Sequence, residues 1–194
     1  EIGDVSMLFL KYKADFTVEE MVQMENELKF SVLGTKELSP DDADLAGKLG
    51  LQVEYVSDLE DDNEAELCQT NNNEFLGLIR LRKELEKYKF AYIHEIIHYV
   101  FDVGCGNKVT SSFARKRKGK TDSRDEQRIN YKTAAYIMPY EEILKALQEY
   151  DHSFPKMNAI QFVRKLQETY EQSETAVIRR IKEVRRISKR AVVR

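Results

Sequence analysis

The stretch His94-Glu95-Ile96-Ile97-His98 decides how this chain of 194 residues is interpreted. It matches the pattern H-E-x-x-H. Two histidines four positions apart project from the same side of a helix, close enough together to bind one metal ion. The glutamate that follows the first histidine can then act as a base on a water molecule at that metal. The pattern therefore predicts a zinc hydrolase built on His94, His98 and Glu95.

The residues around the motif are strongly apolar, which indicates that the motif helix lies in the core. These residues are Phe90, Ala91, Ile93, Ile96, Ile97, Val100 and Phe101. Two histidines and a glutamate would be costly to bury there without a ligand. The chain has three histidines, and two of them lie in this motif. The alternative is a helix with two surface or hydrogen-bonded histidines, and this setting disfavours it.

A catalytic zinc site needs a third protein ligand and an open position. His152 is one candidate, but it lies in a polar turn, where a histidine is usually a surface residue. Glu126 is the better candidate, because it opens an apolar helix that ends at Pro139. Asn130 lies one turn later on the same face and could hydrogen-bond around the ligand. The alternative for Glu126 is an ordinary first-turn glutamate favoured by the helix dipole.

Composition limits the class of protein. Hydrophobic residues make up 42% of the chain, as in globular proteins, and the net charge of −3 alone indicates no partner. Cys68 and Cys105 have no C-x-x-C spacing, so we expect neither a disulfide framework nor a cysteine zinc site. A signal peptide and a long apolar run are not recognisable. We therefore expect a cytoplasmic protein without a membrane partner.

Hydrophobic periodicity predicts an α+β protein in which a small sheet precedes the motif. We expect strands at 51–56 and 75–81, and a weaker one at 66–70. A loop is expected at 106–123. Helices are predicted at 17–34, 39–50, 86–103, 124–138, 140–150, 158–171 and 174–190. The expected organisation is a metallopeptidase-like domain, 1–150, followed by a helical C-terminal extension, 151–194.

Two segments together resemble the ImmA/IrrE family of minimal, gluzincin-like metallopeptidases. That family pairs an H-E-x-x-H helix with a later helix of pattern E-x-x-A-N-x-F-A-A-x-L-M-P. Residues 126–139 follow this pattern as E-x-x-I-N-x-x-x-A-A-x-I-M-P. The upstream helix, strand and Gly-Leu-Ile-Arg-Leu strand at 77–81 are also similar, and the resemblance covers about residues 40–190. The chain differs at Ile97, where glycine is more usual, and at Lys132 and Thr133.

The resemblance implies a zinc-dependent endopeptidase in which His94, His98 and Glu126 bind Zn²⁺ and Glu95 is the catalytic carboxylate. It also implies the substrate, a helix-turn-helix transcriptional repressor of a phage, a mobile element or a stress gene. The group that stabilises the transition state is not identified by the sequence. The candidates are Tyr131, Tyr136, Tyr140 and His152.

The C-terminal segment allows a second function, because residues 159–186 could form a helix-turn-helix. Its first helix would carry an apolar stripe of Ile160, Val163 and Leu166, and its second would turn Val177, Ile181 and Val184 inward. Five basic residues would lie outward: Arg179, Arg180, Lys182, Arg185 and Arg186. Such a helix could contact DNA phosphates. We rather expect these C-terminal helices to pack on the peptidase core, because helix-turn-helix geometry is common in helical proteins. Docking of a protein substrate is a third option. The rival to an enzyme is thus a non-proteolytic regulator that binds DNA or a repressor.

Overall fold

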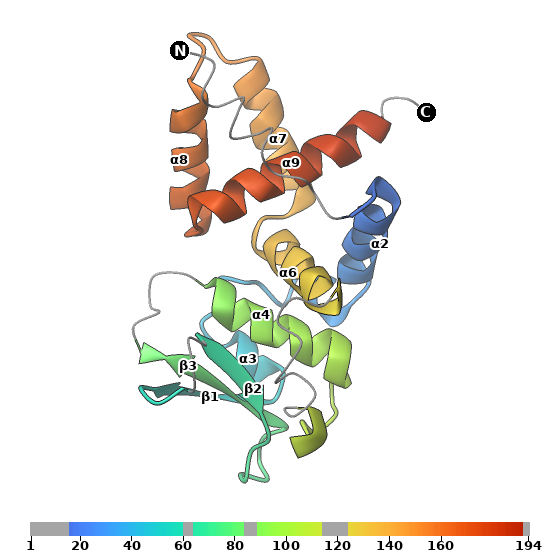
Figure 1. The fold of residues 1–194 in the computed structure, drawn as a ribbon, viewed down its shortest axis with the longest axis vertical. Coiled ribbons are helices and arrows are strands. Elements are labelled where there is room, and N and C mark those ends of the chain that lie inside the picture. The colour runs from blue at the N-terminus through green and yellow to red at the C-terminus, as the bar shows by residue number, and fades with distance from the viewer. Residues whose placement is uncertain (1–15, 60–63, 84–88, 114–123, 192–194) are drawn as a thin grey trace. The chain divides into compact units, whose positions relative to one another are not determined.

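The structure is a computed structural model that describes residues 16–59, 64–83, 89–113 and 124–191. Its residues form two compact units, and Figure 1 shows the elements of both. We call the part formed by Leu28–Tyr136 the sheet unit. We call the part formed by the described residues of 1–27 and 137–194 the helical unit. The separate assignment of 1–150 to a metallopeptidase domain and 151–194 to an extension stays a prediction.

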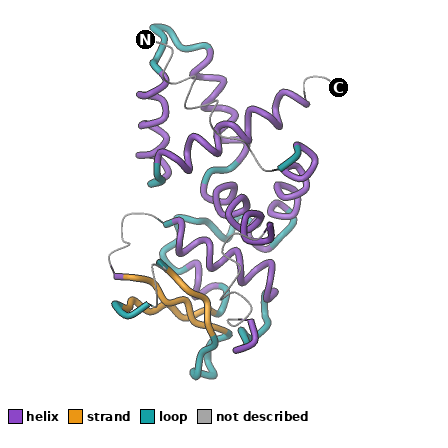
Figure 2. The backbone as a smooth tube through the Cα atoms, viewed as in Figure 1, coloured by secondary structure: helices purple, strands orange, loops and turns teal. Residues whose placement is uncertain are grey.

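The sheet unit contains a mixed sheet of three strands among its described residues, and it confirms the three predicted strands (Figure 2). They are β1 (Leu51–Val56), β2 (Ala65–Cys68) and β3 (Gly77–Arg82), in the order β1-β3-β2. β3 pairs in parallel with β1 and antiparallel with β2. Alternate residues of β3 are buried, namely Gly77, Ile79 and Leu81, as expected for a strand that covers a core with one face.

A short helix, α3 (Leu45–Lys48), leads into β1, so the helix predicted at 39–50 is much shorter than expected. The reason lies in its polar first half. The side chains of Ser39 and Asp42 accept hydrogen bonds from the backbone N–H groups of Asp41 and Asp44, at 3.2 and 2.9 Å. Such local bonds compete with helical ones and hold these residues in turns.

The motif lies in α4 (Phe90–His98), which packs against β2 and β3. Its apolar residues Ile93, Ile96 and Ile97 are fully buried, so the predicted core position of this helix is confirmed. The helix continues as η3 (Tyr99–Gly104), a π-helical turn. The start predicted for this helix, residue 86, lies outside the described residues. So does most of the loop that was predicted at 106–123. Within the described part of that loop, the N–H of Val109 donates to Leu76 O at 2.8 Å.

The second predicted ligand helix is α6 (Arg124–Ile137). It lies above α4 in Figure 1. Every residue from Tyr131 to Ile137 is buried, and so is Met138. The small side chains of Ala134 and Ala135 are also buried, each at 4% exposure.

The helical unit contains α7 (Tyr140–Asp151), α8 (Ala159–Tyr170) and α9 (Glu174–Ala191), close to the helices predicted there. It also contains the first part of α2 (Val18–Lys29). The predicted helix 17–34 ends early, because Ser31 caps a separate 3₁₀ turn, η1 (Val32–Gly34), by accepting from Leu33 N. A capping box of Asn158 and Gln161 starts α8.

The core of the helical unit lies between α9 and its neighbours α7 and α8. The predicted inward residues Val177, Ile181 and Val184 are at most 1% exposed. The prediction for Ile160 was wrong, because this side chain is 59% exposed and Phe162 is buried instead. Phe162, Val163 and Leu166 form the buried face of α8.

The basic residues of α9 do not all lie outward, and the prediction for Arg180 was wrong. Arg180 is fully buried: its Nε donates to Met138 O at 2.9 Å, and its Nη1 lies 2.7 Å from Glu25 Oε1. Glu25 and Met138 are distant in sequence, so periodicity alone could not reveal these partners. In the described part of the chain, no helix is both long and apolar enough to cross a bilayer.

Candidate metal centre

The two motif histidines point their Nε2 atoms at one another from α4. These atoms lie 3.1 Å apart, and the ring centroids are 4.7 Å apart in an edge-on arrangement. His98 is 3% exposed and His94 is half-buried. The helical spacing of four residues produces this convergence, as the sequence predicted.

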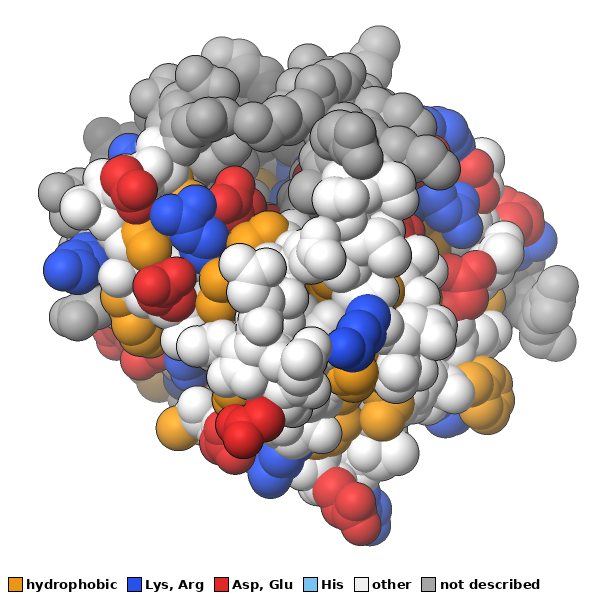
Figure 3. Space-filling model, turned by 90° about the horizontal axis from the view of Figure 1, so that it is seen from below, with side chains coloured by type: hydrophobic (Ala, Val, Ile, Leu, Met, Phe, Trp, Pro, Cys, Tyr) orange, Lys and Arg blue, Asp and Glu red, His pale blue; other side chains and the backbone are white. Residues whose placement is uncertain are grey.

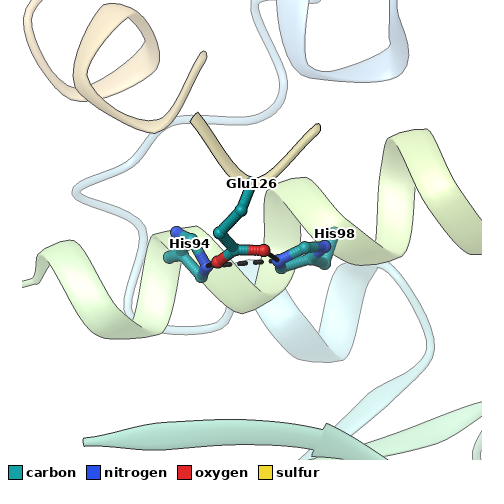
Figure 4. Close-up of side chains that lie close together, drawn as sticks. All are labelled: His94, His98 and Glu126. Atoms are coloured by element: carbon teal, nitrogen blue, oxygen red, sulfur yellow. Dashed lines mark hydrogen bonds and ion pairs between the residues drawn. The ribbon is translucent and has the colours of Figure 1, made fainter. Parts of the chain in front are cut away.

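Glu126 brings a carboxylate to the same point from the first turn of α6 (Figure 4). Its Oε1 lies 2.7 Å from His94 Nε2, and its Oε2 lies 3.2 Å from His98 Nε2. The ligand atoms of His94, His98 and Glu126 all lie within 4.8 Å of one another. They form the single group of this kind found among the described residues. The structure thus brings together the three residues that the sequence selected as ligands.

The spacing of these donors fits a metal ion. Four ligands held tetrahedrally at about 2.0–2.1 Å lie roughly 3.3 Å from one another. The observed separations of 3.1 and 3.2 Å are close to that value, and the 2.7 Å contact is shorter. Two imidazole nitrogens with one carboxylate are a donor set of catalytic zinc sites, which keep the remaining position open.

The electrostatics of Glu126 suit a ligand. Burial alone raises the pKa of this carboxyl group, but the hydrogen bonds from His94 and His98 outweigh it. The pKa therefore lies well below its usual value. The group is ionised at neutral pH, which is the form that binds a metal.

Asp102 is a site residue that the sequence analysis missed. It lies in η3, and its Oδ2 is 2.6 Å from Nδ1 of His98. A proton on Nδ1 is donated to this carboxylate, so Nε2 is the nitrogen of His98 that would give up its proton to bind a metal. The i+4 spacing from His98 was the available signal, because Asp102 follows His98 by the same interval that separates the two histidines.

Aromatic rings lie beside both histidines. The ring of Phe90 is 6.2 Å from that of His94, and the ring of Phe113 meets that of His98 edge-on at 6.3 Å. Both phenylalanines are half-buried. They add apolar surface next to the donors, and a dry surrounding strengthens electrostatic interactions at a site.

Glu95, the predicted catalytic carboxylate, is 2% exposed on α4. Its charge is one of several that act on Cys68 of β2, where burial and then Glu66 raise the pKa of the thiol to about 11. The carboxylate of Glu95 therefore lies within electrostatic reach of that strand. The high pKa leaves Cys68 as a thiol, which suits neither a nucleophile nor a metal ligand.

The remaining predicted site residues lie in different surroundings. Asn130 is half-buried one turn after Glu126, and Tyr131 is buried at 1% exposure. The hydroxyl of Tyr136 is buried without a hydrogen-bond partner among the described residues, and burial, followed by the charge of Asp42, raises its pKa.

Tyr140 and His152 belong to the helical unit rather than to the unit that holds the three ligands. Tyr140 is half-buried, whereas His152 is exposed after the last turn of α7. Nδ1 of His152 lies 2.7 Å from the carbonyl oxygen of Gln148. The group of three ligand atoms does not include this histidine.

Two histidines on one helix, joined by a carboxylate from a second helix beside a small mixed sheet, form a candidate metal centre that fits a metallopeptidase. The comparisons agree with this class. The chain belongs to the family described as the IrrE N-terminal-like domain, Peptidase_M78, whose model matches residues 46–182. The resemblance to the ImmA/IrrE family is therefore confirmed. Neither a curated protein nor a solved structure shows significant similarity to the chain.

Proposed function

We propose that this protein is a zinc-dependent endopeptidase with a minimal gluzincin-like centre. The observation that carries the proposal is the convergence of His94 Nε2, His98 Nε2 and the Glu126 carboxylate on one point. A zinc ion held there would lower the pKa of a coordinated water and polarise the scissile carbonyl. These three residues would hold the ion, and Asp102 would keep His98 in the tautomer that can bind it.

Glu95 performs the proton transfers in this proposal. It takes a proton from the attacking water and then gives it to the amine that leaves. Its position next to His94 on α4 and its burial support this role. Tyr131, Tyr136, Tyr140 and His152 stay candidates for stabilising the oxyanion.

The proposed substrate is a helix-turn-helix transcriptional repressor, so that cleavage would relieve repression. Membership of the IrrE-like family supports this substrate class, since the resemblance associates such peptidases with repressors of phages, mobile elements or stress genes.

The alternative is a non-proteolytic regulator that binds DNA or a repressor. Several basic residues proposed for DNA contact already have partners within the helical unit. Arg179 pairs with Glu183 at 3.1 Å, Arg185 with Asp151 at 3.4 Å, and Arg186 Nη1 donates to Phe16 O at 2.9 Å. These internal partners favour the peptidase. Figure 3 shows a single face of the molecule, seen from below, and on that face acidic and basic side chains of the described residues are mixed.

A comparison of cleavage with binding tests the proposal. Glu95→Gln keeps size and hydrogen bonding but removes the base. We expect this variant to retain zinc and repressor affinity while turnover falls by a factor of roughly 10²–10⁴. The measurements are the zinc content, binding of a repressor encoded beside the protein, and its cleavage by wild type and variant.

Glu149→Gln is the matched control, because Glu149 is an exposed glutamate of α7. It should behave as wild type in all three measurements. If Glu95→Gln keeps full biological activity with zinc bound, the proposal of an enzyme is wrong. That result would favour the non-proteolytic regulator.

A further inference from the structure

Lys132 is a buried charge in the helix that supplies Glu126. The stretch from Tyr131 to Met138 is buried throughout, and Lys132 is its one charged residue, at 6% exposure. A lysine is rarely buried to this extent, because removing an ammonium group from water is costly. Its retention between core residues therefore needs a specific contact.

One contact of Lys132 reaches the π-helical turn that follows the motif. The ammonium nitrogen of Lys132 lies 3.9 Å from the centroid of the Phe101 ring, within the range of a cation–π interaction. Phe101 is in η3, and a π-helical turn within a helix is often found at a functional site. The contact thus joins α6 to η3 inside the sheet unit.

The residue after Phe101 is Asp102, whose carboxylate orients His98 through the 2.6 Å contact to Nδ1. Each helix joined by the Lys132–Phe101 contact therefore carries a residue of the metal centre: Glu126 on α6, and Asp102 on η3. Because η3 continues α4, a shift of this helix against α6 would displace His98 and Asp102 together and change the angle at which the imidazole meets Glu126.

We propose that Lys132 is a positioning residue of the metal centre, which holds η3 against α6 through Phe101 so that His98 and Glu126 keep their relative orientation. This inference rests on the proposed function, because it requires that the three residues bind a metal. Lys132 does not ligate the ion. It acts through Phe101 and Asp102.

Metal binding by the full chain tests this role without an activity assay. The variants are Lys132→Met, which keeps length and removes charge, Lys132→Arg, which keeps charge, and Phe101→Leu, which removes the ring. Zinc affinity is measured by chelator competition, and the ligand geometry by the visible spectrum of the Co²⁺-loaded protein. Asp102→Asn is the reference variant, because it shows how zinc affinity and the Co²⁺ spectrum change when the carboxylate contact to His98 is lost.

We expect Lys132→Met and Phe101→Leu each to weaken zinc binding by about tenfold to a hundredfold, as losses around a ligand do, and to alter the Co²⁺ spectrum. The double variant should bind zinc no more weakly than either single variant, because both substitutions remove the same Lys132–Phe101 contact. Lys132→Arg should restore most of the affinity. Lys182→Met, a half-buried lysine of α9, is the matched control and should bind zinc as wild type does.

A purely structural role gives a different result. In that case Lys132→Met changes the unfolding of the metal-free protein but leaves zinc affinity and the Co²⁺ spectrum as in wild type, which would overturn the inference. If Lys132→Met does not fold, zinc affinity and the Co²⁺ spectrum of Phe101→Leu and Lys132→Arg are compared with those of wild type. That comparison then tests the inference. Wild-type protein that binds neither metal would instead overturn the proposed function.

Discussion

Glu126 illustrates how one residue acquires a role from its surroundings. In the sequence it is an acidic residue in the first turn of a helix, where the dipole already favours it. In the structure its carboxylate lies between the Nε2 atoms of His94 and His98, and their hydrogen bonds overcome the effect of burial on its pKa. A carboxylate held in this way is prepared for a metal ion before the ion binds.

Replacement of Glu126 separates the two candidates for the third ligand. Glu126→Ala removes a donor and should weaken zinc binding by at least about a hundredfold, more than a loss outside the ligand shell. His152→Ala should leave the affinity unchanged, because His152 is exposed and bonded to Gln148. Chelator competition measures both.

Asp125→Ala is the control for a dipole effect, since Asp125 is an exposed acid in the same helical turn. It should retain zinc. A loss of zinc in His152→Ala together with its retention in Glu126→Ala would show that His152 is the third ligand.

Helix α9 shows at the scale of an element why a basic helix is not necessarily a surface for DNA. Its hydrophobic side is buried, but so are Arg180 at 0% exposure and Glu183 at 2%. Arg180 joins α9 to Glu25 of α2 and to the carbonyl oxygen of Met138, just after the end of α6. Its Nη1 also lies 3.7 Å from Glu183 Oε2, and burial raises the pKa of that glutamate.

Removal of Arg180 should therefore destabilise the helical unit strongly. Arg180→Ala leaves Glu25 and Glu183 without this cation, and the loss of one partner from a buried ion pair costs about 3–5 kcal/mol in the free energy of unfolding. Urea denaturation of the metal-free protein, followed by circular dichroism, measures the change.

Arg164→Ala on the exposed side of α8 is the control, with an expected change within about 0.5 kcal/mol. Equal stability of the two variants would mean that the Arg180 contacts contribute nothing net to the fold.

The family match extends over residues 46–182, so at the scale of the whole molecule it includes residues of both the sheet unit and the helical unit. The three proposed ligands all lie in the sheet unit, on α4 and α6. A metal ion bound there would join two helices that are separate in the chain. Binding to the folded state alone would then add to stability in proportion to the logarithm of the free metal concentration.

Zinc should accordingly stabilise the wild-type protein against unfolding. At a free zinc concentration of about 100 times Kd, we expect a gain of roughly 2.7 kcal/mol over the metal-free protein. For a chain of this length that gain corresponds to a rise in Tm of about 5–10 °C. Purified protein should carry about one zinc ion per chain.

Thermal unfolding with zinc or with a chelator measures the effect. His94→Ala and His98→Ala should abolish the rise in Tm on addition of zinc. They should change the Tm of the metal-free protein by less than that rise. An equal response in wild type and in both variants would place the zinc elsewhere on the chain.

The sequence by itself determined the motif helix, its core position, the strands and the family. These features are local, because the periodicity of a helix places His94 beside His98 and alternation marks each strand. The sequence also favoured Glu126 over His152, but only the tertiary structure brought its carboxylate to the histidines, since that depends on how α6 crosses α4. The partners of Arg180 and of Lys132 were likewise decided by packing, because Glu25, Met138 and Phe101 lie far from them in the chain.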